Sequence, residues 1–143
     1  MMRQRWLIGA GLLAFLLNAA PFGRADEAAS VKVLKEANAT IILDDQQPEK
    51  PVVGLIMWGT YNASILKEVQ QLRSLQKLRI GGPWISDKGL KKLRTIKTLQ
   101  MLEIGNATVS EDALKELQSA IPKLKIRRAS PGETPFAGFA EKK

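Results

Sequence analysis

The segment LQKLRIGGPWISDKGLKKL, residues 75–93, returns 24 residues later as LQMLEIGNATVSEDALKEL, residues 99–117. Each leucine and isoleucine of the first copy meets a leucine, isoleucine or valine in the second. The same offset carries Ile56 onto Ile80, so the period extends toward the amino terminus. A regular period of this length is typical of repeat architectures, in which each unit buries its apolar side against its neighbours.

The repeated unit reads L-x-x-L-x-[LI], then [IV]-S-x3-L-x-x-L, and a last partial copy aligns Leu124-x-Ile126 with Leu102-x-Ile104. This unit resembles the leucine-rich repeat of bacterial exported proteins, in about three to four copies. The resemblance implies an α/β fold: a short leucine-rich-repeat solenoid of parallel strands alternating with helices. We place the repeats at residues 51–128.

The segments on either side of the repeats have a different composition. Residues 39–43 and 51–57 are rich in β-branched residues and flank a polar, proline-bearing connection, which predicts a β-hairpin that caps the solenoid at its amino-terminal end. Residues 26–50 are therefore interpreted as a partly helical lead-in and the first strand of the hairpin. Residues 129–143 contain prolines and glycines without apolar periodicity, which predicts a disordered tail.

The first 25 residues have the organisation of an export signal. Arg3 and Arg5 precede an apolar run at 6–20, and Gly23 and Ala25 supply a small-x-small cleavage site. The run is shorter than the roughly 20 residues that a membrane-spanning helix needs. We therefore expect cleavage after Ala25, no stable membrane anchor afterwards, and a periplasmic or extracellular location.

The composition removes several classes of chemistry. The chain of 143 residues has no cysteine and no histidine, which excludes disulfides, thiolate or imidazole metal sites and histidine-based hydrolytic triads. We expect no catalytic residue, metal or cofactor. The formal charge is +8, which falls to +5 when the three arginines of the signal are removed, and this moderate excess favours an anionic partner.

Alternation of side chains along a strand predicts which residues line the outer face of the sheet. Leu78 and Ile80 point into the core, so their neighbours point outward. The alignment of the copies predicts one row of Arg79, Glu103 and Lys125 and a second row of Lys77, Met101 and Lys123. The candidate binding residues are Lys77, Arg79, Met101, Glu103, Lys123, Lys125 and Arg127.

Polar residues mark the ends of the predicted helices. Ser86 and Ser110 stand where strand turns to helix, and their hydroxyls can accept hydrogen bonds from the first-turn amides. Asn38, Asn62 and Asn106 each begin an N-x-[ST] triplet and are interpreted as turn and cap residues.

The sequence leaves open how the first parallel strand and Trp84 pack. Either Leu55 and Met57 or Ile56 and Trp58 face outward, because a slip of one residue exchanges the two faces. The outward pair is covered by the neighbouring hairpin strand, or else it forms a mixed apolar and basic patch for a protein partner. Trp84 either stacks over Trp58 or is an exposed anchor.

Three functions are compatible with these features. The first is a non-catalytic, exported protein-protein interaction module. The second is binding of an anionic polymer such as an acidic polysaccharide through the basic strand face. The third is an enzyme, which would rest on isolated acids such as Glu103, and a single acid among cations is more typical of an ion pair. Nucleic acid is not expected as a partner, because the basic rows have no interleaved aromatic residues to stack on bases.

Overall fold

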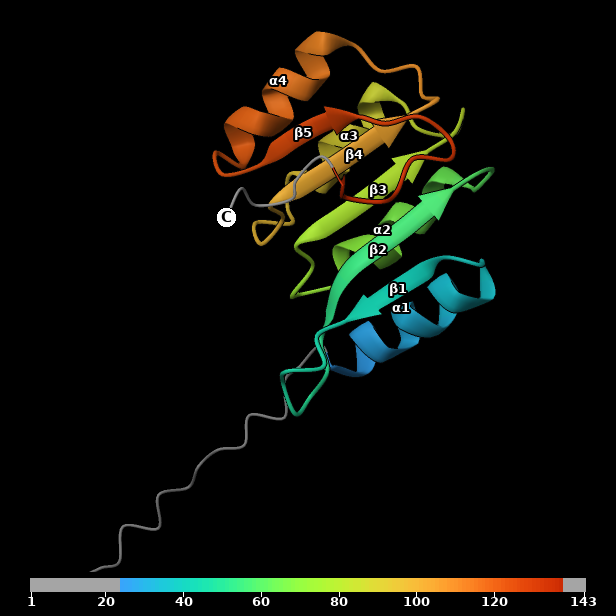
Figure 1. Ribbon diagram of the computed structural model, residues 1–143, viewed down its shortest axis with the longest axis vertical. Helices are drawn as coiled ribbons and strands as arrows, with labels where there is room; N and C mark the ends of the chain where they lie inside the picture. Colours follow the sequence, from blue (N-terminus) through green and yellow to red (C-terminus); the bar gives the residue numbers. More distant parts are fainter. Residues whose placement is uncertain (1–23, 138–143) are drawn as a thin grey trace, which may run out of the picture.

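The computed structural model describes residues 24–137 of the chain. These residues form an α/β fold in which helices alternate with the strands of one five-stranded sheet (Figure 1). The elements are, in chain order, α1 (Arg24–Glu36), β1 (Thr40–Leu43), β2 (Val52–Trp58), η1 (Ala63–Ile65), α2 (Leu66–Gln70), β3 (Lys77–Gly81), α3 (Asp87–Leu93), β4 (Met101–Gly105), α4 (Glu111–Ala120) and β5 (Lys125–Arg128).

The sheet keeps the order of the chain, β1-β2-β3-β4-β5. β1 pairs antiparallel with β2, as the sequence predicts for a hairpin, and the other neighbouring strands pair in parallel. Leu78 lies opposite Leu102 and Ile80 opposite Ile104. The 24-residue period of the sequence is therefore the offset between paired residues of β3 and β4.

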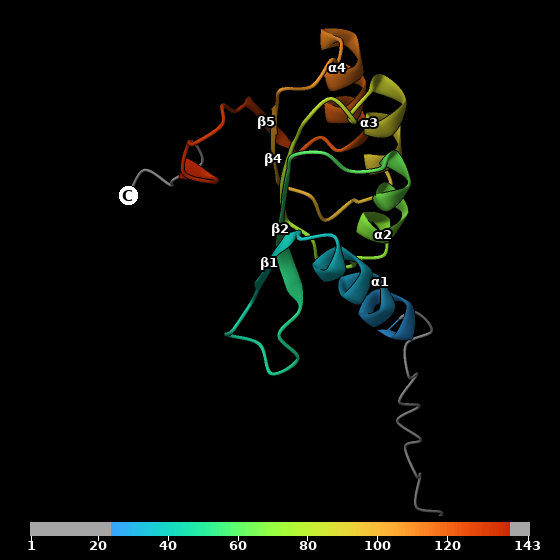
Figure 2. The same cartoon turned by 90° about the vertical axis from the view of Figure 1, so that its right-hand side faces the viewer.

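The four α-helices within residues 24–137 lie on one face of the sheet (Figure 2). The apolar side chains of strands and helices meet between the two layers and form one core, with Leu78, Leu90 and Leu102 among its buried members. α1 extends the helix layer, because its Leu34 is buried in the same core and its Ser30 hydroxyl donates to Glu68 of α2 at 2.6 Å. Each helix thus covers the apolar side of the strand layer beside it.

The predicted caps are present at the helix starts. The Ser86 hydroxyl accepts from the backbone N–H of Gly89, and the Ser110 hydroxyl accepts from Ala113. Asn62 caps η1 by accepting from the backbone N–H of Ser64. Asn38 and Asn106 have positive φ angles of 61° and 48°, a turn conformation that asparagine tolerates better than most residues.

The structure decides the register of β2. Leu55 and Met57 are fully buried in the core, so Ile56 and Trp58 face the side opposite the helices. β1 does cover part of this side, because Ile42 lies over Gly54: a Cβ added there would be 2.9 Å from the Ile42 side chain. Pairing with β1 therefore protects the edge of β2, as an aggregation-resistant sheet requires.

The last strand pairs two residues away from the predicted register. Ile126 lies opposite Leu102, and Arg128 takes the place opposite Ile104 that we assigned to Ile126. The α4 helix, with ten residues, is the longest of the three helices within the repeats, and Leu124 after it is buried. Leu124, which aligns with Leu102 in the sequence, therefore packs into the core just before β5 and is not part of that strand. The offset between paired residues of β4 and β5 is 24, as it is between β3 and β4.

The structure describes little of the predicted export signal and most of the predicted tail. The predicted export signal falls almost wholly outside the described residues, and none of the helices within residues 24–137 is long and apolar enough to cross a membrane. The predicted tail falls partly within the described residues: residues 129–137, called the strap below, lie on the side of the sheet opposite the helices (Figure 2). Residues 138–143 lie outside the described part.

Candidate functional site

The seven candidate residues lie on or beside the outer face, but they form different rows from those predicted. Register across the parallel strands brings together Arg79, Glu103 and Arg127, called the charge network below. A second row, the open row, contains Lys77, Met101 and Lys125. The shift at β5 explains the change, since it moves Arg127 and Lys125 into the places predicted for Lys125 and Lys123. Lys123 is exposed and precedes the strand.

Glu103 is the centre of the charge network. Arg79 Nη1 donates to Glu103 Oε2 at 2.8 Å, and Arg127 Nη2 donates to Oε1 at 2.6 Å. The Glu103 side chain is fully buried and that of Arg79 is 4% exposed, whereas that of Arg127 is 30% exposed. The prediction that Glu103 is an ion-pair partner is therefore confirmed, and the pair is shielded from water, which screens surface ion pairs.

The pKa of Glu103 reflects two opposing influences. Burial raises it, because a charged carboxylate is poorly solvated inside a protein. Hydrogen bonds from Arg127, from the backbone N–H of Phe136 and from Arg79 lower it, and together they prevail. The pKa of Glu103 is therefore below its ordinary value of 4.5, and the group is ionised at neutral pH.

Trp58 packs against the charge network from β2. Its ring lies across β3 and β4: a Cβ added to Gly81 would be 2.6 Å from the ring, and one added to Gly105 would be 2.5 Å from it. The guanidinium carbon of Arg79 lies 4.7 Å from the ring centroid, within the range of a cation–π interaction. The absence of side chains at Gly81 and Gly105 thus makes room for the indole on the face.

The strap contacts the part of the outer sheet face that carries the charge network. The Ser130 carbonyl accepts from Arg79 Nη2 at 3.1 Å, and the Glu133 carboxylate accepts from Arg127 Nη1 at 2.8 Å. Ala129 is buried, and its N–H donates to the carbonyl of Ile104, which continues the pairing of β5 with β4. Arg79 and Arg127 of the charge network thus donate hydrogen bonds to the strap.

Trp84 has a different neighbour from the one considered in the sequence. Its ring centroid lies 5.3 Å from that of Tyr61 with the planes tilted by 56°, and its Nε1 donates to the Gly81 carbonyl at 3.1 Å. It is half-buried and packs against the core. Trp84 therefore stacks on Tyr61 and not on Trp58.

The open row is the part of the candidate site that remains accessible. Lys125 is exposed, and Lys77 and Met101 are half-buried. The row combines an unbranched apolar side chain with two flanking cations. Methionine adapts its shape to an opposing surface, and lysine ammonium groups favour opposing carboxylates. The open row is thus suited to binding and offers no arrangement of acid, base and nucleophile.

Sequence reasoning did not identify the charge network as a unit. The signal was present, because Arg79, Glu103 and Arg127 follow one another at 24-residue intervals. This regular spacing was missed because the last copy was aligned by placing Leu124 on Leu102, which put Lys125 in the row in place of Arg127.

Neither a metal-binding cluster nor a similarity to a known protein indicates what the outer face binds. Within residues 24–137 there is no group of three or more acidic, histidine or cysteine side chains that could hold a metal ion. Comparison with protein-family models, with curated proteins and with solved structures gave no match.

Proposed function

We propose that this chain is an exported leucine-rich-repeat protein that binds a protein partner through the open row and catalyses no reaction. The repeat pattern supports the family: residues one period apart pair in register between β3 and β4 and between β4 and β5, and β2, β3 and β4 are each followed by a helix on the same face. Between β2 and β3 the offset is 23 residues, so Ile80 lies opposite Met57 and not opposite Ile56. In such a solenoid the antiparallel β1 would close the amino-terminal end. The apolar run at 6–20 and the small residues before Ala25 support export to the periplasm or beyond.

The observation that carries the binding proposal is the unequal covering of the sheet. Parallel sheets are normally covered on both faces. Here the helices cover one face, while the strap contacts the charge network on the other and leaves the open row partly accessible. A partner that docks on Lys77, Met101 and Lys125 would complete the second layer.

The side chains of the open row indicate which chemical groups a partner would carry. The two lysines favour a segment that carries carboxylates, and Met101 between them favours an apolar side chain at its centre. Exposed charge pairs contribute little on their own, so the apolar contact would supply most of the affinity and the lysines its orientation and specificity.

The alternative of an anionic polymer along the whole strand face is less well supported. It would rely on five basic residues, but Arg79 and Arg127 are already bound to Glu103. Their charges are offset within the protein, and Arg79 has almost no accessible surface.

The test is crosslinking from defined positions, for which the absence of cysteine provides a clean background. Lys123→Cys, beside the open row, and, as a control on the helix side, Lys88→Cys each carry a photoactivatable thiol reagent and are mixed with the native envelope fraction. We expect a discrete covalent adduct from residue 123 and none of that mass from residue 88.

A second control uses charge. Adding Lys77→Glu and Lys125→Glu to the Lys123→Cys chain should remove the adduct while the far-ultraviolet circular dichroism stays unchanged. Equal adducts from both labelled positions, or none from residue 123, would contradict the proposal.

A further inference from the structure

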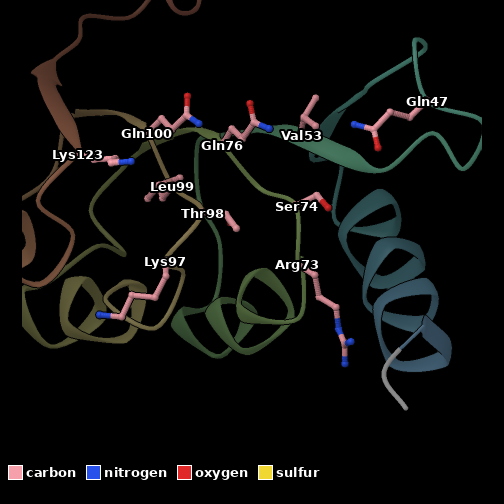
Figure 3. Close-up of a pocket in the computed structure, with 10 residues that line it drawn as sticks. All are labelled: Gln47, Val53, Arg73, Ser74, Gln76, Lys97, Thr98, Leu99, Gln100 and Lys123. Atoms are coloured by element: carbon pink, nitrogen blue, oxygen red, sulfur yellow. The ribbon is translucent and has the colours of Figure 1, made fainter. Parts of the chain in front are cut away.

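A hollow of about 330 Å³ lies at the amino ends of the strands, outside the charge network and the open row. Figure 3 shows side chains around it from the hairpin connection, from β2 and from the loops that lead into β3, β4 and β5. Its lining residues are Gln47, Val53, Arg73, Ser74, Gln76, Lys97, Thr98, Leu99, Gln100 and Lys123.

The lining is polar and basic. It has three cations, three carboxamides and two hydroxyls, with no carboxylate and no aromatic ring. Its two apolar members are Val53 and Leu99. A hollow with this composition favours an anionic ligand that also carries many hydroxyl groups.

The repeat period duplicates the donor set. Residues 73–76 read Arg-Ser-Leu-Gln, and residues 97–100 read Lys-Thr-Leu-Gln. Each copy therefore presents a cation, a hydroxyl and a carboxamide in the same order. Because the copies lead into adjacent parallel strands, equivalent groups are separated by about the strand spacing of 4.8 Å. A repeated donor set matches a ligand with a repeated unit.

Backbone hydrogen bonds fix the position of the two carboxamides. The N–H of Gln100 donates to the carbonyl of Gln76 at 2.8 Å, and the N–H of Gln76 donates to Val53 at 2.9 Å. In Figure 3 the side chains of Gln76 and Gln100 lie side by side and point away from the helices. They can donate to and accept from vicinal hydroxyls without rearrangement of the backbone.

Two further groups are held in place by the loops. Lys97 Nζ donates to the carbonyl of Ala120 at 2.9 Å, and the Thr98 hydroxyl donates to the carbonyl of Leu75 at 2.7 Å. The ammonium group keeps further donors, and the hydroxyl keeps lone pairs for a ligand. Ordering these groups before binding reduces the entropy that a ligand has to overcome.

We infer that this hollow binds a short stretch of an anionic polysaccharide, with Lys97 and Lys123 on its carboxylate or sulfate groups and the carboxamides on its hydroxyls. An acidic peptide fits less well, because protein hot spots usually seat an aromatic or apolar anchor in a pocket. A nucleic acid fits less well, because the lining offers no ring on which bases could stack. This inference does not depend on the proposed protein partner, since that partner would contact the open row.

The test is calorimetric titration of the purified chain with four probes: tetragalacturonate, a sulfated tetrasaccharide, neutral maltotetraose and inorganic phosphate. We expect binding of one or both charged oligosaccharides, weaker or no binding of the other two probes, and affinity that falls when ionic strength rises from about 0.02 to about 0.5 M. The preferred charged probe identifies the anionic group.

A matched pair of variants locates the binding. Lys97→Gln with Lys123→Gln removes two charges from the hollow, and Lys88→Gln with Lys115→Gln removes two exposed charges from the helices. We expect the first variant to lose about tenfold in affinity, as two exposed charge contacts would give, and the second to stay close to wild type. The inference is overturned if neither charged oligosaccharide binds at low salt, if both variants lose affinity equally, or if phosphate binds as tightly as the oligosaccharide.

Discussion

Replacing Glu103 by glutamine should reduce the free energy of unfolding by about 3–5 kcal/mol, as is typical when one partner of a buried ion pair is lost. The reason is that Arg79, only 3% exposed, would keep its charge with no carboxylate beside it. Its remaining neighbours would be the Ser130 carbonyl and the ring of Trp58. Chemical denaturation of the variant and the wild type measures the difference.

The matched control for this prediction is Glu111→Gln. Glu111 also accepts from an arginine, Arg128, at 2.9 Å, but the two side chains are 74% and 46% exposed. Its loss should cost less than about 1 kcal/mol. Equal costs at positions 103 and 111 would show that the charge network is not shielded from solvent.

Lowering the pH should remove the stabilisation that the ionised Glu103 carboxylate provides. Its pKa is lowered in the folded protein, so its contribution to stability is complete above the ordinary value of 4.5 and is lost as pH falls through the lowered value. The difference between wild type and Glu103→Gln should therefore narrow below pH 4.5. Asp87 has a lowered pKa as well, but it lies outside the charge network, so its effect is the same in both proteins and cancels in the difference.

Replacing Gly105 by alanine should destabilise the protein by about 1–3 kcal/mol, the usual cost of overpacking. The added Cβ would be 2.0 Å from the carbonyl oxygen of Ala129 and 2.5 Å from the Trp58 ring. Because one of these atoms is backbone, the strap must move away from β4 to relieve the overlap. Thermal unfolding followed by far-ultraviolet circular dichroism measures the loss of stability.

The control is Gly89→Ala in α3. There the added Cβ would be 3.2 Å from the end of the flexible Leu66 side chain, and alanine favours a helix over glycine by up to about 1 kcal/mol. We expect a change near zero or a small gain in stability. A Gly105→Ala protein as stable as wild type would contradict the close contact of the strap with the sheet.

Local patterns predicted the elements of the fold well. Ser86 and Ser110 cap the helices because a hydroxyl needs only the first-turn amides of its own segment. The period of leucine and isoleucine predicted the pairing of β3 with β4, since equal spacing in sequence gives equal register in a stack. The hairpin of β1 and β2 followed from two β-branched runs around a polar turn.

The failures share one cause, which is that contacts distant in the chain decide them. The pairing of β5 depends on how α4 packs, so the apparent match of Leu124 to Leu102 gave the wrong register. The contacts of Ser130 and Glu133 were not predicted, because they are made to arginines that only the folded sheet brings together. The hollow likewise combines the hairpin connection with the loops that lead into β3, β4 and β5.

The division of the outer face between the strap and the open row is tested most directly by thiol labelling. Single-cysteine variants Met101→Cys and Ala129→Cys are treated with a maleimide, with Ser119→Cys on the exposed side of α4 as the reference. We expect residue 101, flanked by two lysines that favour the thiolate, to react at a rate comparable to the reference. Residue 129 should react at least about 100-fold more slowly, which corresponds to about 2.7 kcal/mol for local opening. Equal rates at 129 and 119, or protection of 101, would contradict the division.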